Sequence, residues 1–510
     1  MTRDGEIADV RSQMKLDQVY CRDLPTIPTP SNGPVLVTGG TGYIGGRLVP
    51  ELLARGYKVR VMVRSRSPEH AERWPDAEVA VADASDAASL ALALKGIHTA
   101  YYLIHSLLLG PKEFEASDLA NAINFRRAAE ENGVARIIYL GGLGDVRTFL
   151  SPHLRSRMRV AEELGSGRVP ATVLRAAIII GSGSASYEIL QHLVRKLALI
   201  PIPYWGRTKC QPISIRDVIK YLVGVLEKPE TAGASFDIGG NDVLTYEEMM
   251  RVIAEVLGKK RVFVHSCLSN IKFHAYLTGL LTPVPALITR SLMEGLQNDV
   301  VCLDRRISQL VPFRMLTYRE SVIRALLRED QDTVDTRWSD AYPLAHELSI
   351  KLHELKHAPR YTASATLLTT KNAPALFHSI CRIGGKAGWF HENWMWRLRG
   401  MMDSLLMGVG TARGRRSLST LRVNDVIDFW RVEALVENRL LLLRAEMKLP
   451  GLAWLKFSID PQNGQNRLSV TAYYDTRTFS GKLYWYTFLP FHGYIFGRLI
   501  RNIAERNTIT

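Results

Sequence analysis

The chain has 510 residues, of which 46% are hydrophobic and 23% are charged, and this is the composition of a globular protein with about three structural units. No uncharged apolar run is long enough to span a membrane as a helix, since Pro283 and Pro285 interrupt the longest one. The net charge of +15 is compatible with nucleic acid, an anionic membrane surface or anionic ligands as partners.

The first 32 residues are polar and lack the apolar core of a secretory signal, so we predict a disordered tail on a cytoplasmic protein. The five cysteines are far apart in the sequence, without the paired spacing of a zinc site or a redox dithiol. We therefore expect reduced, structural cysteines and no metal site.

Residues 34–240 alternate short aliphatic runs with amphipathic stretches. This alternation is typical of a parallel β-sheet wound with helices, and it predicts a Rossmann-type, doubly wound α/β domain over residues 33–330. Residues 241–330 look mainly helical and are expected to form a substrate lid over the carboxyl edge of the sheet. The aliphatic runs predicted as strands are 35–37, 58–63, 79–82, 100–104, 136–140 and 172–180.

A charged stretch and a helix-like run at 344–356 predict a connector at residues 331–359, and the composition changes after it. Residues 360–510 hold 21 Lys and Arg against 10 Asp and Glu, a net charge of +11, and six of the nine tryptophans. Their pattern predicts an α+β domain in which an antiparallel sheet holds a terminal helix at 493–506. A first strand from Tyr361 and a short helix at 373–383 precede the other predicted strands, which are 427–435, 439–448, 453–459, 467–474 and 482–489.

The segment Thr38-Gly39-Gly40-Thr41-Gly42-Tyr43-Ile44-Gly45 follows a hydrophobic strand and leads into a helix. Glycines suit a tight turn there, and they let the backbone approach a pyrophosphate whose charge is stabilised by amides at the helix N-terminus. A glycine pattern also occurs in ordinary strand-to-helix turns. Because the strand, the helix and the repeating α/β pattern agree, we predict dinucleotide binding.

Two residues that follow the next strands bear on the choice of cofactor. Arg64 stands where an NAD-specific site usually has a carboxylate for the ribose 2′-hydroxyl, and an arginine there favours a 2′-phosphate. The alternative is a solvated loop arginine. Asp83 is placed to accept a hydrogen bond from the adenine amino group, or alternatively to cap a helix at 85–94. The sequence therefore favours NADP(H) over NAD(H).

On these residues the chain resembles the atypical short-chain dehydrogenases/reductases, in particular NmrA-like NAD(P)H-binding proteins and relatives of the 39 kDa subunit of respiratory complex I. The resemblance covers about residues 33–325. It implies that the pyrophosphate is contacted by the glycine-rich turn, the 2′-phosphate by Arg64, the adenine by Asp83 and Ala84, and the ribose region by the loop at His105. The turn residues to which it assigns this contact are Gly39, Thr41, Gly42, Tyr43, Ile44 and Gly45.

The catalytic pattern of that superfamily, Tyr-x-x-x-Lys with a serine, is absent at the equivalent place. The sequence there reads His153-Leu154-Arg155-Ser156-Arg157. His153 is a candidate for an acid or base near neutral pH, and Arg157 is a candidate for a group that holds the nicotinamide ribose. The alternative is a surface helix with polar residues, which would leave the catalytic residues unknown.

The second predicted domain resembles the helix-grip fold of START and Bet v 1 proteins, which enclose an apolar ligand cavity. Its fusion to a reductase-like domain also resembles bacterial two-domain proteins whose C-terminal part has no assigned function. The aromatic strand predicted at 483–488 either fills a solid core or lines such a cavity.

Charged residues of this domain allow two interpretations each. Strand alternation places several of them on one face of each of two neighbouring strands. They would form either a polar cluster at the floor of a cavity or solvated cross-strand pairs. The residues concerned are Phe429, Arg431, Glu433, Arg444 and Glu446. The run from Arg413 through Gly414, Arg415 and Arg416 fits a phosphate or an anionic lipid headgroup, and an exposed hairpin edge explains it equally well.

The sequence thus predicts an NADP(H)-dependent oxidoreductase that acts on a hydrophobic carbonyl, enone or quinone-like compound. The alternative is a non-catalytic protein that senses NADP(H) or stabilises an assembly. A third hypothesis is a protein that binds RNA or a membrane surface. Its only support is the positive charge and the number of tryptophans. We expect a small hydrophobic ligand and peripheral membrane contact as partners, and no nucleic acid.

Overall fold

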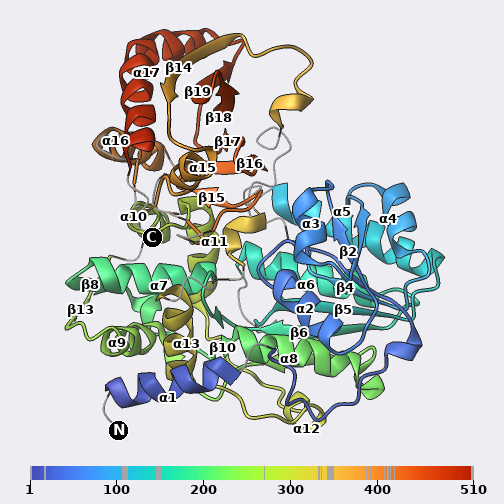
Figure 1. Ribbon diagram of the computed structural model, residues 1–510. Coiled ribbons are helices and arrows are strands. Elements are labelled where there is room, and N and C mark those ends of the chain that lie inside the picture. Colours follow the sequence, from blue (N-terminus) through green and yellow to red (C-terminus); the bar gives the residue numbers. More distant parts are fainter. Residues whose placement is uncertain are drawn as a thin grey trace. The chain divides into compact units, whose positions relative to one another are not determined.

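The computed structural model describes residues 3–16, 19–105, 113–144, 151–268, 270–330, 334, 336–341, 350–385, 388–389, 393–406, 408–410, 413, 415–417 and 420–506. The chain divides into two compact units, shown in Figure 1. Unit 1 comprises Met1–Leu281 and Leu287–Tyr342, and unit 2 comprises Thr282–Ala286 and Pro343–Thr510. The main boundary falls inside the stretch predicted as a connector, 331–359, and part of the helix-like run predicted at 344–356 lies outside the described residues.

Unit 1 contains a seven-stranded sheet in the order β11-β6-β5-β4-β1-β2-β3, and all its neighbouring strands are parallel. This confirms the predicted Rossmann-type sheet. The strand order reverses between β1 and β4, which is where ligands bind in open α/β sheets. The strands are β1 (Val35–Val37), β2 (Val59–Val63), β3 (Glu78–Val81), β4 (Thr99–Tyr102), β5 (Arg136–Gly142), β6 (Ala171–Ala176) and β11 (Ser235–Ile238).

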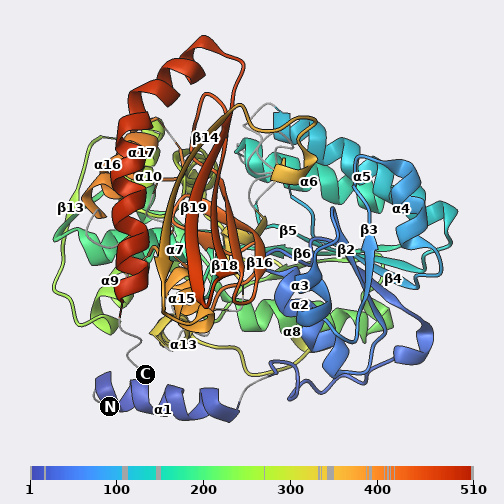
Figure 2. The same ribbon diagram turned by 45° about the horizontal axis from the view of Figure 1, so that its top comes forward.

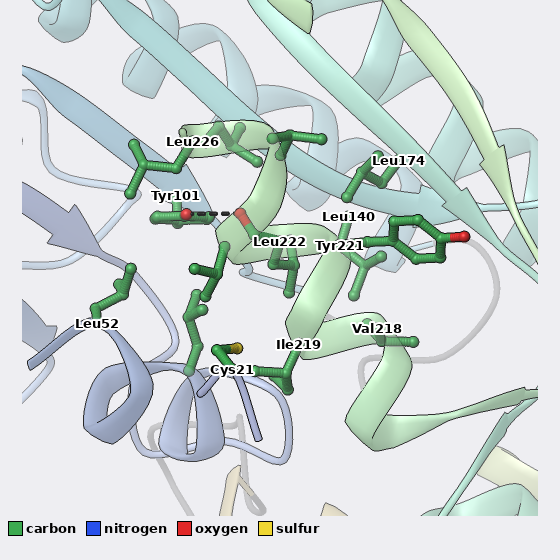
Figure 3. Close-up of a cluster of buried hydrophobic side chains, with 14 of the residues drawn as sticks. Cys21, Leu52, Tyr101, Leu140, Leu174, Val218, Ile219, Tyr221, Leu222 and Leu226 are labelled. Atoms are coloured by element: carbon green, nitrogen blue, oxygen red, sulfur yellow. Dashed lines mark hydrogen bonds between the residues drawn. The ribbon is translucent and has the colours of Figure 1, made fainter. Parts of the chain in front are cut away.

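Two hydrophobic clusters cover the two faces of this sheet, because successive strand residues point to opposite sides. Val35 and Val37 belong to the cluster that α2 and α8 complete, whereas Leu36 belongs to the cluster under α4, α5 and α6. Figure 3 shows the α8 side, where the Tyr101 hydroxyl donates a hydrogen bond to the Leu222 carbonyl at 2.8 Å. The helices are α2 (Gly45–Ala54), α3 (Pro68–Arg73), α4 (Ala87–Leu94), α5 (Glu113–Glu131), α6 (Pro152–Gly165) and α8 (Ile215–Leu226).

The rest of unit 1 is mainly helical, as predicted for residues 241–330. Its longer helices are α7 (Ala185–Lys196), α9 (Tyr246–Val256), α10 (Ile271–Leu281), α11 (Ala286–Glu294) and α13 (Tyr318–Asp330), with the short α12 (Ile307–Leu310). Three two-stranded ladders join them: β10 (Ile213–Ser214) with β7 (Ile179–Ile180), β12 (Leu244–Thr245) with β9 (Lys209–Cys210), and β13 (Val262–His265) with β8 (Leu199–Ile202).

The N-terminal segment corrects the prediction of a disordered tail over residues 1–32. Residues Arg3–Leu16 form helix α1, whose Val10 is buried and whose Glu6 pairs with Arg319 of α13 at 2.9 Å. Further along, the carboxylate of Glu51 accepts hydrogen bonds from the backbone amides of Tyr20 and Cys21. The partners of this segment lie far away in the sequence, so its local polarity gave no sign that it is anchored.

Unit 2 contains a six-stranded antiparallel sheet in the order β14-β19-β18-β17-β16-β15, with the long helix α17 packed against β14 and β19 (Figure 2). The strands are β14 (Tyr361–Thr369), β15 (Val426–Ile427), β16 (Trp430–Val436), β17 (Leu440–Ala445), β18 (Leu452–Gln462) and β19 (Gln465–Asp475). The helices are α15 (Ala373–Cys381), α16 (Asn393–Leu405) and α17 (Phe479–Glu505). The predicted antiparallel sheet is confirmed, and α16 was not predicted.

The strand predicted at 482–489 is wrong, because these residues form the first half of α17. Thr478 caps the helix by accepting a hydrogen bond from the Gly481 amide at 3.1 Å. The side chains buried against the sheet, Trp485, Phe496, Leu499, Ile500 and Ile503, follow helical spacing. Aromatic residues favour strands only weakly, and packing against a sheet overrides that preference here. None of the described helices is both long enough and apolar enough to cross a membrane.

Candidate functional site

The glycine-rich turn lies at the carboxyl end of β1, directly before α2. Thr38 joins the ends of two strands: its hydroxyl donates to the Tyr101 carbonyl at 2.9 Å and accepts from the Leu103 amide at 2.9 Å. Gly39 has a φ of +63°, in the left-handed region that favours glycine, and a Cβ there would lie 2.8 Å from the Leu103 carbonyl oxygen. A Cβ on Gly45 would overlap the Gly39 carbonyl. The turn is therefore a close-fitting cradle at a helix N-terminus, as a pyrophosphate requires.

The residues predicted to contact the adenine end follow β2 and β3, the strands beside β1. Arg64 is exposed. Burial acts to raise the pKa of Asp83, but hydrogen bonds from Ser85 and the charge of Arg64 together hold it below its ordinary value. The Ala84 carbonyl accepts a hydrogen bond from Asn124 at 3.2 Å. Arg64, Asp83 and Ala84 thus lie along the same sheet edge as the glycine-rich turn.

The structure contradicts the alternative role of Asp83 as a helix cap. Helix α4 begins at Ala87, and its cap is Asp86, whose carboxylate accepts from the Ala88 amide at 3.1 Å. Asp83 instead accepts from the amide and hydroxyl of Ser85, at 2.8 and 2.6 Å.

Arg73 of α3 is a basic residue near the cradle that the sequence did not single out. Its guanidinium lies over the ring of Trp74 at 4.8 Å, and a Cβ on Gly46 would meet its terminal nitrogen. The side chain therefore reaches the first turn of α2. No local motif marks this residue, because α3 and α2 are brought together only by the sheet.

Two histidines meet beyond the carboxyl ends of β4 and β5. His105 follows β4 and His153 lies in the first turn of α6, and their ring centroids are 4.9 Å apart. The Nδ1 of His105 lies 3.0 Å from the carboxylate of Asp118 on α5, which the Ser156 hydroxyl also approaches at 3.4 Å. Helical spacing in the sequence could have pointed to Asp118. It lies four residues before Ala122 and seven before Phe125, and all three side chains are on the buried face of α5.

Both histidines are held in the neutral form. Burial, followed by the charge of Arg157, lowers the pKa of His105 even though Asp118 opposes the shift. Burial, followed by the neighbouring His105 and Arg157, lowers the pKa of His153 well below its ordinary value. The Nδ1 of His153 is buried and has no hydrogen-bond partner among the described residues. A neutral imidazole can both donate and accept a proton, which is the property a proton-transfer site needs.

Arg157 is fixed against the end of β5. Its guanidinium lies 5.2 Å from the centre of the Tyr139 ring and donates to the Leu140 carbonyl, while the Tyr139 hydroxyl donates to the Arg157 carbonyl at 3.2 Å. Together with His153, it lines a cavity. The alternative that this helix merely presents polar residues to solvent is therefore wrong.

The cavity has a volume of about 480 Å³ and lies within unit 1. Tyr43 and Ile44 of the glycine-rich turn line it, as do His105, His153 and Arg157. The remaining wall is mostly aliphatic, with contributions from α7, β8, α10 and α11 that include Leu190, Leu193, Leu197, Ile200, Leu277, Leu281 and Leu292. The predicted lid, residues 241–330, thus supplies one part of this apolar wall through α10 and α11, and α7 and β8, which precede it in the sequence, supply another.

Tyr43 is anchored at this cavity by its neighbours. The guanidinium of Arg47 lies 4.3 Å from the centre of its ring and donates to the carbonyls of Tyr43, Thr336 and Ser182. The Tyr43 hydroxyl is buried without a hydrogen-bond partner among the described residues, and burial raises its pKa. Thr336 belongs to the predicted connector, so the start of that stretch is part of the site in unit 1.

Unit 2 contains a separate cluster of buried charges. The carboxylate of Glu446 pairs with Arg413 at 2.8 Å and with Arg431 at 2.5 Å, and Arg444 lies 3.9 Å away. All four side chains are buried, so the alternative of solvated cross-strand pairs is wrong. Glu433 is engaged elsewhere, since it accepts from the Leu352 amide and the Trp454 indole, and Phe429 is fully buried.

The basic run after residue 412 is also internal where it is described. Arg415 donates to the carbonyls of Cys381 and Ile383, and Arg416 pairs with Asp425 at 2.7 Å. The alternative of an exposed hairpin edge is therefore wrong for Arg413, Arg415 and Arg416. Gly414 lies outside the described residues.

Comparisons with known proteins divide the chain at a similar place. The NmrA-like family pattern matches residues 31–287, just over half of the chain, and a family described as a protein of unknown function (DUF2867) matches residues 357–499. A nucleoside-diphosphate-sugar epimerase structure from Staphylococcus aureus is 19% identical and covers 57% of this chain and 99% of its own, with a TM-score of 0.48.

Three relatives align with 43–46% of the chain. They are subunit 9 of the NADH dehydrogenase [ubiquinone] 1 alpha subcomplex of Arabidopsis thaliana (26% identical over 57% of its length), divinyl chlorophyllide a 8-vinyl-reductase of Zea mays (29% over 61%) and ceramide reductase of Caulobacter vibrioides (28% over 73%). The chain thus spans about three fifths of the length of the first two. With its parallel sheet, its glycine-rich turn and a family match over more than half of its residues, the chain belongs to the NmrA-like family.

Proposed function

We propose that the protein is an NADP(H)-dependent reductase of a hydrophobic carbonyl, enone or quinone-like substrate. The observation that carries this proposal is the lining of the cavity in unit 1. It includes residues of the glycine-rich turn, a pair of neutral histidines and a largely aliphatic wall. Such a pocket can hold an apolar molecule beside a dinucleotide and offer it a proton.

The cofactor roles follow from the order of the strands. In this proposal Gly39, Thr41, Gly42, Tyr43, Ile44 and Gly45 hold the pyrophosphate at the start of α2. Arg64 pairs with a 2′-phosphate, Asp83 and Ala84 border the adenine, and His105 borders the ribose region. Arg73, which reaches the first turn of α2, adds a second positive charge near the phosphates. The names of two relatives, a vinyl-reductase and a ceramide reductase, support the reductase assignment.

The reaction needs a hydride and a proton, and the bound dinucleotide supplies the hydride. In this proposal the neutral imidazole of His153 gives its N–H proton to the substrate atom that becomes negative and takes a proton from water in return, and His105 is oriented beside it by Asp118. The fixed charge of Arg157 favours the anion that develops before protonation. The aliphatic wall excludes water and selects an apolar substrate.

The direct test is titration with NADPH followed by assays of NADPH consumption against quinones, enones and long-chain ketones. We expect binding that quenches tryptophan fluorescence, and turnover with at least one apolar class. Arg155→Ala is the matched control for variants of the cavity residues His153 and Arg157. Arg155 lies on the same helix, α6, and among the ion pairs of the described residues it pairs only with Glu115. Absence of NADPH binding would overturn the proposal entirely.

A second candidate is a non-catalytic NADP(H)-binding protein that senses the cofactor or stabilises an assembly. Its support is the absence of Tyr-x-x-x-Lys, together with relatives named as a NADH dehydrogenase subunit and a photosystem II assembly factor. NADPH binding without turnover of any substrate class would favour it.

We also propose that unit 2 adopts a helix-grip fold that binds a small apolar ligand. The packing of α17 along β14 and β19 supports this arrangement. A structure of the protein with a copurified or added fatty acid checks it: density between α17 and the sheet is expected, and a solid core there would contradict it.

A further inference from the structure

Helix α17 has two apolar faces, and the fold of unit 2 uses only one. The inner face packs on the sheet through Trp485, Phe496, Leu499 and other buried side chains. The opposite side of α17 carries large apolar residues at steps of four, three and eight, which keep to one side of a helix, and they stay exposed: Phe479 (81%), Leu483 (59%), Tyr486 (62%) and Tyr494 (52%). Large apolar side chains that stay exposed along one side of a helix mark a site of interaction.

Helix α16 carries a second row of exposed apolar side chains. Its side chains Leu398, Met401, Met402 and Leu405 are also 44–54% exposed, at the same helical spacing. The two helices are neighbours, because the guanidinium of Arg399 on α16 lies 4.8 Å from the Tyr484 ring and 5.6 Å from the Phe488 ring of α17. Both views show them together (Figures 1 and 2). We refer to the exposed residues of α16 and α17 as the outer face.

The charges on the outer face have nearly one sign. Lys482, Arg498 and Arg501 are exposed on α17, and Glu505 is the only acidic residue of that helix. Arg498 lies 4.7 Å from the centre of the Tyr494 ring, so a cation and an aromatic ring are paired at the same place. Residues 360–510 as a whole carry a net charge of +11.

We propose that the outer face docks unit 2 on the surface of an anionic phospholipid bilayer. Leucine, phenylalanine and methionine side chains enter the boundary of the acyl chains, while the tyrosine rings and the basic groups lie at the level of the headgroups. The helix lies in the plane of the interface, since its inner face remains on the sheet. Association with a second copy through the same face would bring like charges together, which opposes a dimer.

The experiment is flotation of the full-length protein with vesicles of phosphatidylcholine alone, or of phosphatidylcholine mixed with phosphatidylglycerol. We expect binding to the anionic vesicles that weakens as salt is raised, and at least about tenfold weaker binding to neutral vesicles. Leu483→Ser/Tyr486→Ser and Lys482→Glu/Arg501→Glu should each lower binding by about tenfold or more. These positions are exposed, so the variants should fold normally.

Matched controls use exposed residues of unit 1. Leu92→Ser/Leu303→Ser replaces apolar side chains that are 75% and 72% exposed, and Arg306→Glu/Arg314→Glu reverses two exposed charges. Both controls should bind vesicles like the parent protein. Equal loss in the controls, equal binding to neutral vesicles, or a stable dimer in light scattering that the Leu483→Ser/Tyr486→Ser variant abolishes would each overturn the proposal. Because no nucleotide is needed for this assay, its outcome is separate from that of the reductase proposal.

Discussion

The two units each bury a cluster of polar side chains, and the clusters differ in what balances them. In unit 1, His105, His153 and Arg157 border a cavity of about 480 Å³. In unit 2, Glu446 lies between Arg413 and Arg431, with all three side chains almost fully buried. We call the first the open cluster, because it faces a space that a ligand can enter. We call the second the closed cluster, because its charges are balanced by its own ion pairs.

The direction of the pKa shifts expresses the same difference. In unit 1 burial outweighs the nearby carboxylate, so the pKa of His105 falls and the imidazole is neutral. In unit 2 burial acts to raise the pKa of Glu446, but Arg431 and Arg413 outweigh it and hold the pKa below its ordinary value. Residue types suited to catalysis therefore border a ligand-sized cavity in one unit and stabilise the fold in the other, according to their neighbours.

The largest expected effect is on the closed cluster. Glu446→Gln removes the carboxylate that, among the described residues, pairs with both Arg413 and Arg431, so the free energy of unfolding of unit 2 should fall by about 3–5 kcal/mol. Urea denaturation followed by tryptophan fluorescence measures this. Asp460→Asn, which breaks an exposed pair with Arg467, is the control and should cost no more than about 1 kcal/mol. Similar losses in the two variants would mean that the buried cluster does not stabilise the unit.

The open cluster should respond in activity. For a substrate that the protein reduces, His153→Ala should lower kcat by about a hundredfold or more, the scale of a lost acid or base, with little change in NADPH affinity. Stopped-flow NADPH oxidation and fluorescence titration separate the two quantities. An unchanged kcat would mean that the proton comes from another group or from water.

Acid should weaken the open cluster first. The folded pKa of His153 lies well below its ordinary value of 6.5, so the unfolded chain binds the proton more readily and the contribution to stability is lost as the pH falls below 6.5. Glu446 has a lowered folded pKa, so its contribution is present above 4.5 and is lost only at lower pH.

His153→Phe should remove that dependence, which denaturation at several pH values between 5 and 7 would measure. Replacement of the exposed His265 by Phe controls for the loss of a histidine. If the free energy of unfolding still falls with pH as steeply in His153→Phe as in the parent protein, His153 is not a buried neutral imidazole.

The smallest expected effect is that of replacing Arg64, which is exposed, unlike the buried Arg413 and Arg431 of the closed cluster. Arg64→Glu should leave stability nearly unchanged but reduce the preference for NADPH over NADH by about tenfold, since it replaces the partner of a 2′-phosphate by a repelling charge. Arg66→Glu, in the same loop, is the control. Equal titrations of both cofactors in the parent protein would remove Arg64 from the site.

Several features could be predicted because neighbouring residues determine them. The strand at 35–37, the glycine-rich turn and the helix after it follow from hydrophobic runs and from the conformations that glycine permits, and the structure has them at the predicted places. The parallel sheet followed from the repetition of such units. In unit 2, four of the five later strands were predicted within a few residues.

Contacts between distant residues decided the rest. Asp118 joins His105, Thr336 joins Arg47, and Glu6 joins Arg319, yet each pair is separated by a stretch of sequence that carries no sign of the contact. Residues 482–489 are strand-like by composition, and only the sheet beneath them makes a helix with one buried face. The sequence by itself determined local backbone geometry and the sheet that hydrophobic alternation requires. The tertiary structure alone decided which polar groups lose water and which charges balance them, because burial and electrostatic pairing depend on distances in space.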